Sequence, residues 1–210
     1  MRLERGSFER TRNHWWWRPG WGPGTRYVTF HLTFERAPTL AAEAARIGGL
    51  LSEVPGVDVI PPEWLHLTMT GVGFAADLDG GTLDRLAEAV FGRVSSLTTG
   101  PLSLSWLYLH REGLSLAAEP TPWLSELKLA QEAAVAAATG AGRAGVEPFH
   151  PHVSLAYFSG EVDESALVRA VDDAAPREIV VEQPMVSMIE LNRDRQVYTW
   201  RVLAQVPLSS

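Results

Sequence analysis

The chain has 210 residues, of which 46% are hydrophobic and 20% are charged, an ordinary balance for a globular protein that forms one large domain or two lobes. The formal net charge of −7 argues against a protein that coats long nucleic acid, so we expect no long DNA partner. The absence of cysteine excludes disulfides, thiolate nucleophiles and cysteine-based zinc sites.

Residues 1–25 are predicted to form an irregular N-terminal arm that is rich in tryptophan and arginine. Up to residue 26 the chain holds six arginines against two glutamates, so this segment is either an anion-facing patch or a solvated arm. Its run "HWWWRPGW", residues 14–21, could stack bases, form the surface of an interaction module, or pack over the body as a hydrophobic lid. We favour packing, with one ring left at the mouth of a cleft.

The N-terminus lacks the apolar core of a secretory signal, and the chain has no run of the about 20 apolar residues that a membrane span needs. We therefore expect a cytoplasmic protein that has no membrane partner.

Alternation and capping signals predict a mixture of strands and helices after the arm. Residues 26–34 alternate between apolar and polar side chains, as in a strand with one apolar face. Further strands are predicted, in chain order, at 57–60, 64–72, 102–110, 113–119, 149–158, 177–192 and 197–208. Helices are predicted from residue 39, from an N-cap at Thr82, from an N-cap at Thr121 to Gly140, and from a cap at Asp163 to about residue 171. Because helices and strands do not strictly alternate, this order predicts an α+β fold with antiparallel sheets.

A histidine followed two positions later by a hydroxyl residue occurs in three predicted strands, at His31, His66 and His152. Side chains two apart on a strand lie on the same face, so each histidine lies beside its hydroxyl. Only the pairs His66–Thr68 and His152–Ser154 share apolar flanks and a following glycine, and they occupy matching places in the two halves of the chain. We interpret these two pairs as functional.

The motifs "LHLTMTG", residues 65–71, and "PHVSLAY", residues 151–157, resemble those of the two-histidine (2H) phosphoesterases, which include the 2′-5′ RNA ligase-like proteins and cyclic nucleotide phosphodiesterases. The order of strands and helices over residues 26–207 is also similar. The resemblance implies one bilobal domain over residues 26–210, in which two antiparallel sheets face a central cleft, helices lie outside, and the halves are related by a pseudo-twofold axis. It says nothing about the arm.

The chemistry of such a site follows from its residue types. Cleavage of a 2′,3′-cyclic or 2′-5′ phosphodiester requires proton removal from the attacking oxygen and proton donation to the leaving oxygen. Two imidazoles suit both tasks, because their ordinary pKa of about 6.5 lies near working pH. The Thr68 and Ser154 hydroxyls can donate hydrogen bonds to the non-bridging phosphate oxygens. We expect His66, Thr68, His152 and Ser154 to be catalytic and expect no metal or cofactor. The partner is expected to be a small nucleotide or an RNA end, bound by a monomer.

Three further residues are candidates for substrate binding. Tyr157 points away from the histidine face on strict alternation, but the resemblance allows it to contact substrate if the strand bulges. Thr29 and His31 lie on the polar face of the first strand, which would form the floor of the cleft. Arg143, before the second motif, is interpreted as a surface residue that could reach a phosphate. His14 has no partner at metal-ligand spacing, and His150 receives no role.

Two other functions stay open at this level. A binding protein could keep the cleft and bind nucleotide or RNA without turnover, and a cleft blocked by the arm would favour it. An interaction module would use the tryptophan-rich arm as its surface.

Overall fold

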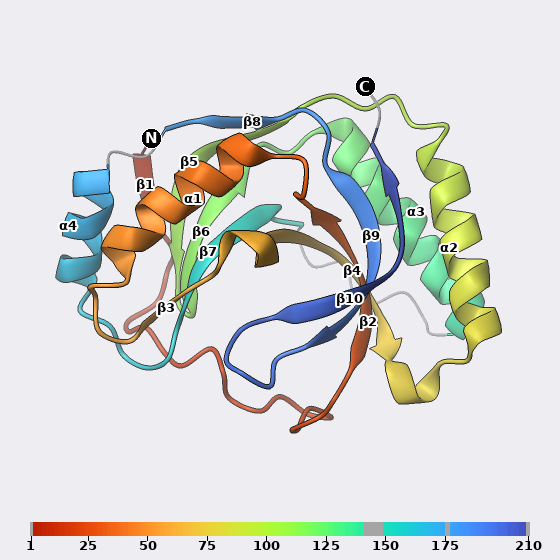
Figure 1. Ribbon diagram of the computed structural model, residues 1–210, viewed down its shortest axis with the longest axis horizontal. Helices are drawn as coiled ribbons and strands as arrows, with labels where there is room; N and C mark the ends of the chain where they lie inside the picture. Colours follow the sequence, from red (N-terminus) through yellow and green to blue (C-terminus); the bar gives the residue numbers. More distant parts are fainter. Residues whose placement is uncertain (1, 141–148, 175–176, 209–210) are drawn as a thin grey trace.

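The computed structural model describes residues 2–140, 149–174 and 177–208 (Figure 1). Its helices are α1 (Pro38–Leu51), α2 (Gly80–Val94), α3 (Pro122–Thr139) and α4 (Glu164–Ala174), with short 3-10 turns η1 (Pro62–Trp64) and η2 (Ala75–Asp77). Its strands are β1 (Arg2–Arg5), β2 (Tyr27–Thr33), β3 (Val57–Val59), β4 (His66–Phe74), β5 (Leu102–His110), β6 (Gly113–Ala118), β7 (His152–Phe158), β8 (Ile179–Val181), β9 (Met185–Asn192) and β10 (Thr199–Pro207). Within these described ranges, no helix has the length and apolar character to cross a membrane.

The predicted α+β class is confirmed, and the strands form one sheet in the order β1-β5-β6-β7-β4-β2-β9-β10. Strands β3 and β8 pair with β7 and β5 beside this path. The two separate sheets expected from the sequence are not confirmed, because the strands form one continuous sheet. Strands β4 and β7 pair at a single position, Leu67 with Val153, which divides this sheet into two halves. The pseudo-twofold relation between the halves stays a prediction.

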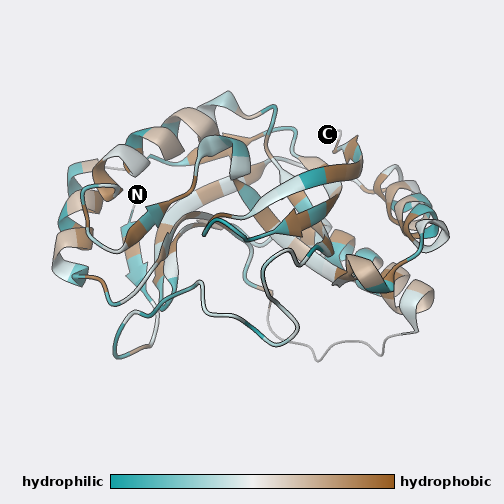
Figure 2. Cartoon of the chain, turned by 60° about the horizontal axis from the view of Figure 1, so that its bottom comes forward, coloured by the Kyte–Doolittle hydropathy of each residue, from teal (hydrophilic) through white to brown (hydrophobic). Residues whose placement is uncertain are grey.

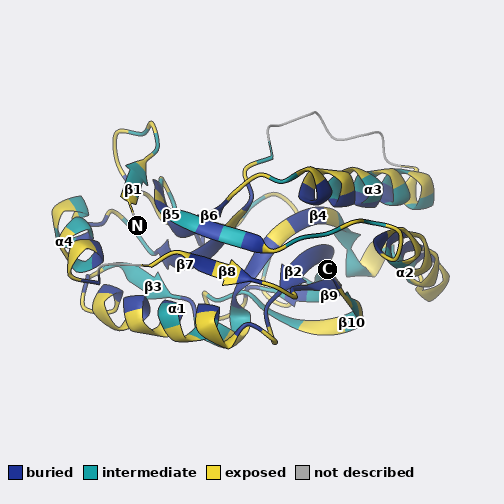
Figure 3. Cartoon of the chain, turned by 90° about the horizontal axis from the view of Figure 1, so that it is seen from above, coloured by how far each residue is buried: buried dark blue, intermediate teal, exposed yellow. Residues whose placement is uncertain are grey.

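A pair of helices covers each half of the sheet. Helices α2 and α3 pack together over the β4–β2–β9–β10 half, and α1 and α4 pack together over the other (Figure 1). Their sheet-facing sides are buried and their outer sides exposed (Figure 3), as the mixture of hydrophobic and hydrophilic residues along each helix requires (Figure 2). On β2, Val28, Phe30 and Leu32 are completely buried in this core, as the alternation predicts.

Capping residues fix where the helices begin. Helix α3 starts as predicted, because the Thr121 hydroxyl accepts a hydrogen bond from the backbone N–H of Leu124. It ends at Gly140, whose left-handed φ of 67° favours glycine. The prediction that Thr82 caps α2 was wrong. The carboxylate of Asp79 accepts from the Thr82 N–H at 2.7 Å, and the helix therefore begins before Thr82.

The arm is not wholly irregular, which corrects the prediction for its first residues. Strand β1 pairs in parallel with β5, where it covers a backbone edge that would otherwise lack partners. The arm then runs along the lower edge of the molecule in Figure 1 and joins β2. Backbone hydrogen bonds from Gly6 to Leu109 and from His14 to Phe158 hold the arm against β5 and the end of β7.

The tryptophans of the arm have different environments. Trp15 is buried, with 8% exposure, and its indole N–H donates to the Asp58 carboxylate at 2.7 Å, so the packing prediction is confirmed there. Packing was the wrong prediction for Trp16 and Trp17, which are 42% and 48% exposed. Trp21 packs against Phe74 at the side of a cavity.

Candidate active site

A cavity of about 690 Å³ lies where the two halves of the sheet and the arm meet. Five of the six histidines of the chain line it, and they come from separate parts of the sequence. These are His14, His31, His66, His110 and His152. No group of three or more histidine and carboxylate side chains in residues 2–140, 149–174 and 177–208 has an arrangement that could hold a metal ion.

The first motif stands at the start of β4. The Nδ1 of His66 lies 2.9 Å from the carbonyl oxygen of Trp64. Because a carbonyl only accepts, Nδ1 carries a proton and donates it, which leaves Nε2 available in the neutral ring. Thr68 follows on the same face and is exposed to the cavity.

The second motif repeats this arrangement at the start of β7. The Nδ1 of His152 lies 2.8 Å from the carbonyl oxygen of His150, again two residues before the histidine. Ser154 follows on the cavity side and is almost completely buried. The two motifs therefore present the same imidazole nitrogen to one cavity from opposite halves of the sheet.

The two histidines differ in burial. His66 is 6% exposed, whereas His152 is exposed. Burial lowers the pKa of His66 to about 4; the bond to Trp64 opposes this shift, and electrostatic repulsion from His152 adds to it. His66 is therefore neutral at physiological pH, which suits a proton acceptor.

A β-bulge changes the direction of Tyr157. Along the β6–β7 pairing, Leu114 lies opposite Ala156 but Ser115 lies opposite Ser154, so Leu155 is an extra residue in β7. The extra residue reverses the alternation, so Tyr157 faces the cavity, whereas strict alternation would point it away.

Strand β4 bulges at the corresponding place. Phe30 pairs with Thr70 but His31 pairs with Thr68, so Met69 is extra, and Gly71 reaches the cavity face. In both motifs the residue three positions after the hydroxyl thus faces the cavity.

Thr29 and His31 line the cavity beneath the first motif, as predicted. The Thr29 hydroxyl donates to the Thr70 carbonyl at 3.1 Å. The ring of His31 stacks on that of His66 with centroids 4.5 Å apart, and neither of its nitrogens has a hydrogen-bond partner among the described residues. Burial, followed by the charge of His66, holds the pKa of His31 well below its usual range. Arg143 lies outside the described residues.

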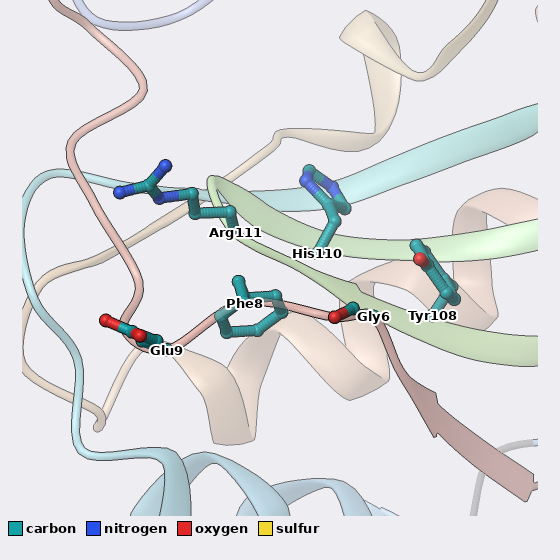
Figure 4. Close-up of a pocket in the computed structure, with 7 residues that line it drawn as sticks. Gly6, Phe8, Glu9, Tyr108, His110 and Arg111 are labelled. Carbon is teal, nitrogen blue, oxygen red and sulfur yellow. The ribbon is translucent and has the colours of Figure 1, made fainter.

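His110, which lies close to the second motif, was not identified as a candidate from the sequence. Nε2 of His110 lies 3.1 Å from the Ser115 hydroxyl, which lies 3.4 Å from the Ser154 hydroxyl. Burial lowers the pKa of His110 to about 4. Figure 4 shows His110 and Tyr108 along one strand, beside Phe8 of the arm, around a smaller pocket of about 330 Å³.

Glu112, in the β5–β6 turn, joins the arm to the cavity and was also missed. Its carboxylate accepts from Arg12 at 2.6 Å and Arg18 at 3.0 Å, and it lies 3.1 Å from Nδ1 of His14. Burial raises the pKa of Glu112, but the bond from Arg12 and the nearby cations lower it overall. Burial and then the charge of Arg18 lower the pKa of His14 to about 3.

These shifts predict that the free energy of unfolding falls in acid. His14, His66 and His110 ionise near pH 6.5 when unfolded but only near pH 3 to 4 when folded, so the unfolded chain binds more protons. Their contribution is complete above pH 6.5 and is lost as the pH falls towards 4. We expect a loss of at least about 2 kcal/mol between pH 7 and 5. Denaturant unfolding at both pH values measures it, and equal stabilities would contradict the burial of these rings.

Several solved structures have a fold similar to that of this chain. TT0787 of Thermus thermophilus aligns with a TM-score of 0.62 at 14% identity, over 87% of this chain and 97% of that chain. A structure described as a phosphoesterase aligns with a TM-score of 0.56 at 13% identity, over 88% and 99%. Apo LigT of E. coli aligns with a TM-score of 0.53 at 14% identity, over 89% and 99%.

No protein-family model and no curated protein matches the sequence. The chain nevertheless has the α+β fold of LigT, of TT0787 and of the structure described as a phosphoesterase across most of its length. The resemblance predicted from the two histidine motifs is therefore confirmed at the level of the fold.

Proposed function

We propose that the protein is a metal-independent 2H phosphoesterase that cleaves, or in reverse joins, 2′,3′-cyclic or 2′-5′ phosphodiesters of nucleotides or RNA ends. One observation carries the proposal. His66 and His152 line the same cavity, and each is fixed through Nδ1 by the carbonyl two residues before it, which leaves Nε2 for proton transfer. Groups held in this way are suited to general acid–base catalysis of phosphoryl transfer.

The difference in burial supports a base role for His66 and an acid role for His152 in this proposal. In cleavage of a 2′-5′ diester, neutral His66 accepts the proton of the attacking 3′-hydroxyl. The 3′-oxygen bonds to phosphorus, the bond from phosphorus to the 5′-oxygen breaks, and His152 protonates that oxygen. Hydrolysis of the resulting cyclic phosphate exchanges the two roles. His152 accepts a proton from water, and the water oxygen bonds to phosphorus. The bond from phosphorus to the 3′-oxygen breaks, and His66 protonates that oxygen. Run backwards, the first step is a ligation.

The neighbouring side chains have supporting roles in this proposal. Thr68 and Ser154 donate to the non-bridging phosphate oxygens. His31 supports the ring of His66 by stacking. Tyr157 and Thr29, on the cavity surface, bind the substrate.

The solved neighbours support a nucleotide as the partner. LigT has been crystallised with phosphate, 3′-AMP, ATP and NADP+. A cavity of about 690 Å³ is in the range of small-molecule sites. Both motifs come from one chain, which supports a monomer as the active form.

The test is an assay of the wild-type protein with EDTA on 2′,3′-cyclic AMP and on a 2′-5′-linked diadenosine. We expect turnover of at least one of them, with a rate that EDTA does not change. Absence of turnover on both, with either compound bound, would instead favour the non-catalytic binding protein. The cavity remains open beside the arm, so the blocked cleft that would have supported that alternative is not observed.

A further inference from the structure

A second cavity, of about 610 Å³, shares His152 and His110 with the first. The ring centroids of these two histidines are 6.0 Å apart, and both rings stand where the two cavities adjoin. The other lining residues of the second cavity are Glu4, Trp106, Tyr108, Ala117, Ala118, Pro120, Phe149, His150 and Pro151.

The sheet register explains why this space exists. His152 on β7 pairs with Ala117 on β6, and Ala117 pairs with Trp106 on β5. These three residues form one row across the sheet, in which the smallest side chain stands between an imidazole and an indole. The methyl group of Ala117 therefore leaves a gap whose far wall is an aromatic ring.

The lining is suited to a flat, uncharged group. Trp106, Tyr108 and Phe149 supply aromatic surface, and Tyr108 is 37% exposed. Nucleobases stack on such rings, and this stacking does not depend on which base is present. Among the described residues, the lining includes no lysine or arginine, and its one carboxylate, Glu4, is paired with Arg2 at 2.5 Å. A further phosphate would find no lysine or arginine among these described lining residues.

We infer that the second cavity binds the leaving alcohol of a linear diester, as a nucleoside that carries no further phosphate. The inference rests on the proposed function. The scissile phosphate lies between His66 and His152, and the bond from phosphorus to the 5′-oxygen breaks beside His152, where the two cavities adjoin. His152 gives its proton to that oxygen, and the released nucleoside lies in the second cavity. A 2′,3′-cyclic nucleotide has no such group and uses only the first cavity.

The experiment compares two variants on two substrates. Ala117→Phe fills the second cavity, and Trp106→Ala removes its aromatic wall. We expect each to lower kcat/KM for 2′-5′-linked diadenosine by about 10- to 100-fold, as loss of base stacking does. Turnover of 2′,3′-cyclic AMP should stay close to that of wild type. Leu129→Ala, at an exposed position of α3 that lines neither cavity, is the control and should change the turnover of neither substrate.

The outcomes separate this inference from the proposed function. Equal losses on both substrates in Trp106→Ala, with unchanged melting temperature, would overturn the second cavity as a binding site and leave the phosphoesterase intact. Unchanged diadenosine turnover in both variants would also overturn it. If the wild-type protein turns over neither substrate, the proposed function itself would be removed. If Ala117→Phe displaces His152 and lowers both activities, Trp106→Ala decides the question.

Discussion

His66→Ala and His152→Ala are each expected to lower kcat/KM for 2′-5′-linked diadenosine by about 10²–10⁴-fold, the usual loss when a general acid or base is removed. The reason is geometric, since each imidazole is held by one backbone carbonyl and offers its other nitrogen to the cavity. Steady-state kinetics on purified variants measure the loss.

The pH dependence distinguishes a proton-transfer role from a loss of structure. In the proposed mechanism His66 is the base and His152 the acid, so removal of His66 should abolish the acidic limb of the pH profile of kcat/KM, and removal of His152 should abolish the basic limb. A uniform loss with both limbs retained would indicate a damaged fold. Wild-type activity in either variant would exclude the mechanism.

Arg193→Ala is expected to destabilise the protein by about 2–4 kcal/mol, because a buried cation that donates two hydrogen bonds is lost. Arg193 is 4% exposed and donates to the carbonyls of His14 at 3.0 Å and Trp16 at 3.4 Å. Its guanidinium also lies 5.4 to 5.9 Å from the ring centroids of four aromatic residues. These are Trp15, Trp17, Trp21 and Tyr198.

The same substitution should raise KM, because arm residues line the cavity. Arg195→Ala is the matched control, since Arg195 is exposed in the same turn and should change stability by less than about 0.5 kcal/mol. Denaturant unfolding and kinetics of both variants test the prediction. An unchanged stability in Arg193→Ala would show that the arm is held without this residue.

Local patterns were sufficient to predict much of the fold. The alternation of β2 and the Thr121 cap of α3 each follow from neighbouring residues alone, and both motif histidines could be identified from their spacing. Tyr157 could not be placed, because the bulge that turns it depends on the pairing of β7 with β6. His110 and Glu112 carry no motif, and only the folded structure brings His110 beside Ser115 and Glu112 beside His14.

The single pairing between β4 and β7 has a mechanical consequence. Leu67 and Val153 stand next in sequence to His66 and His152, so the pivot on which the halves would bend lies one residue from each imidazole. Bending about a pivot displaces distant parts most and adjacent parts least. Thermal flexing of the molecule would therefore move the helices and the outer strands, while the gap between the two rings keeps nearly constant width.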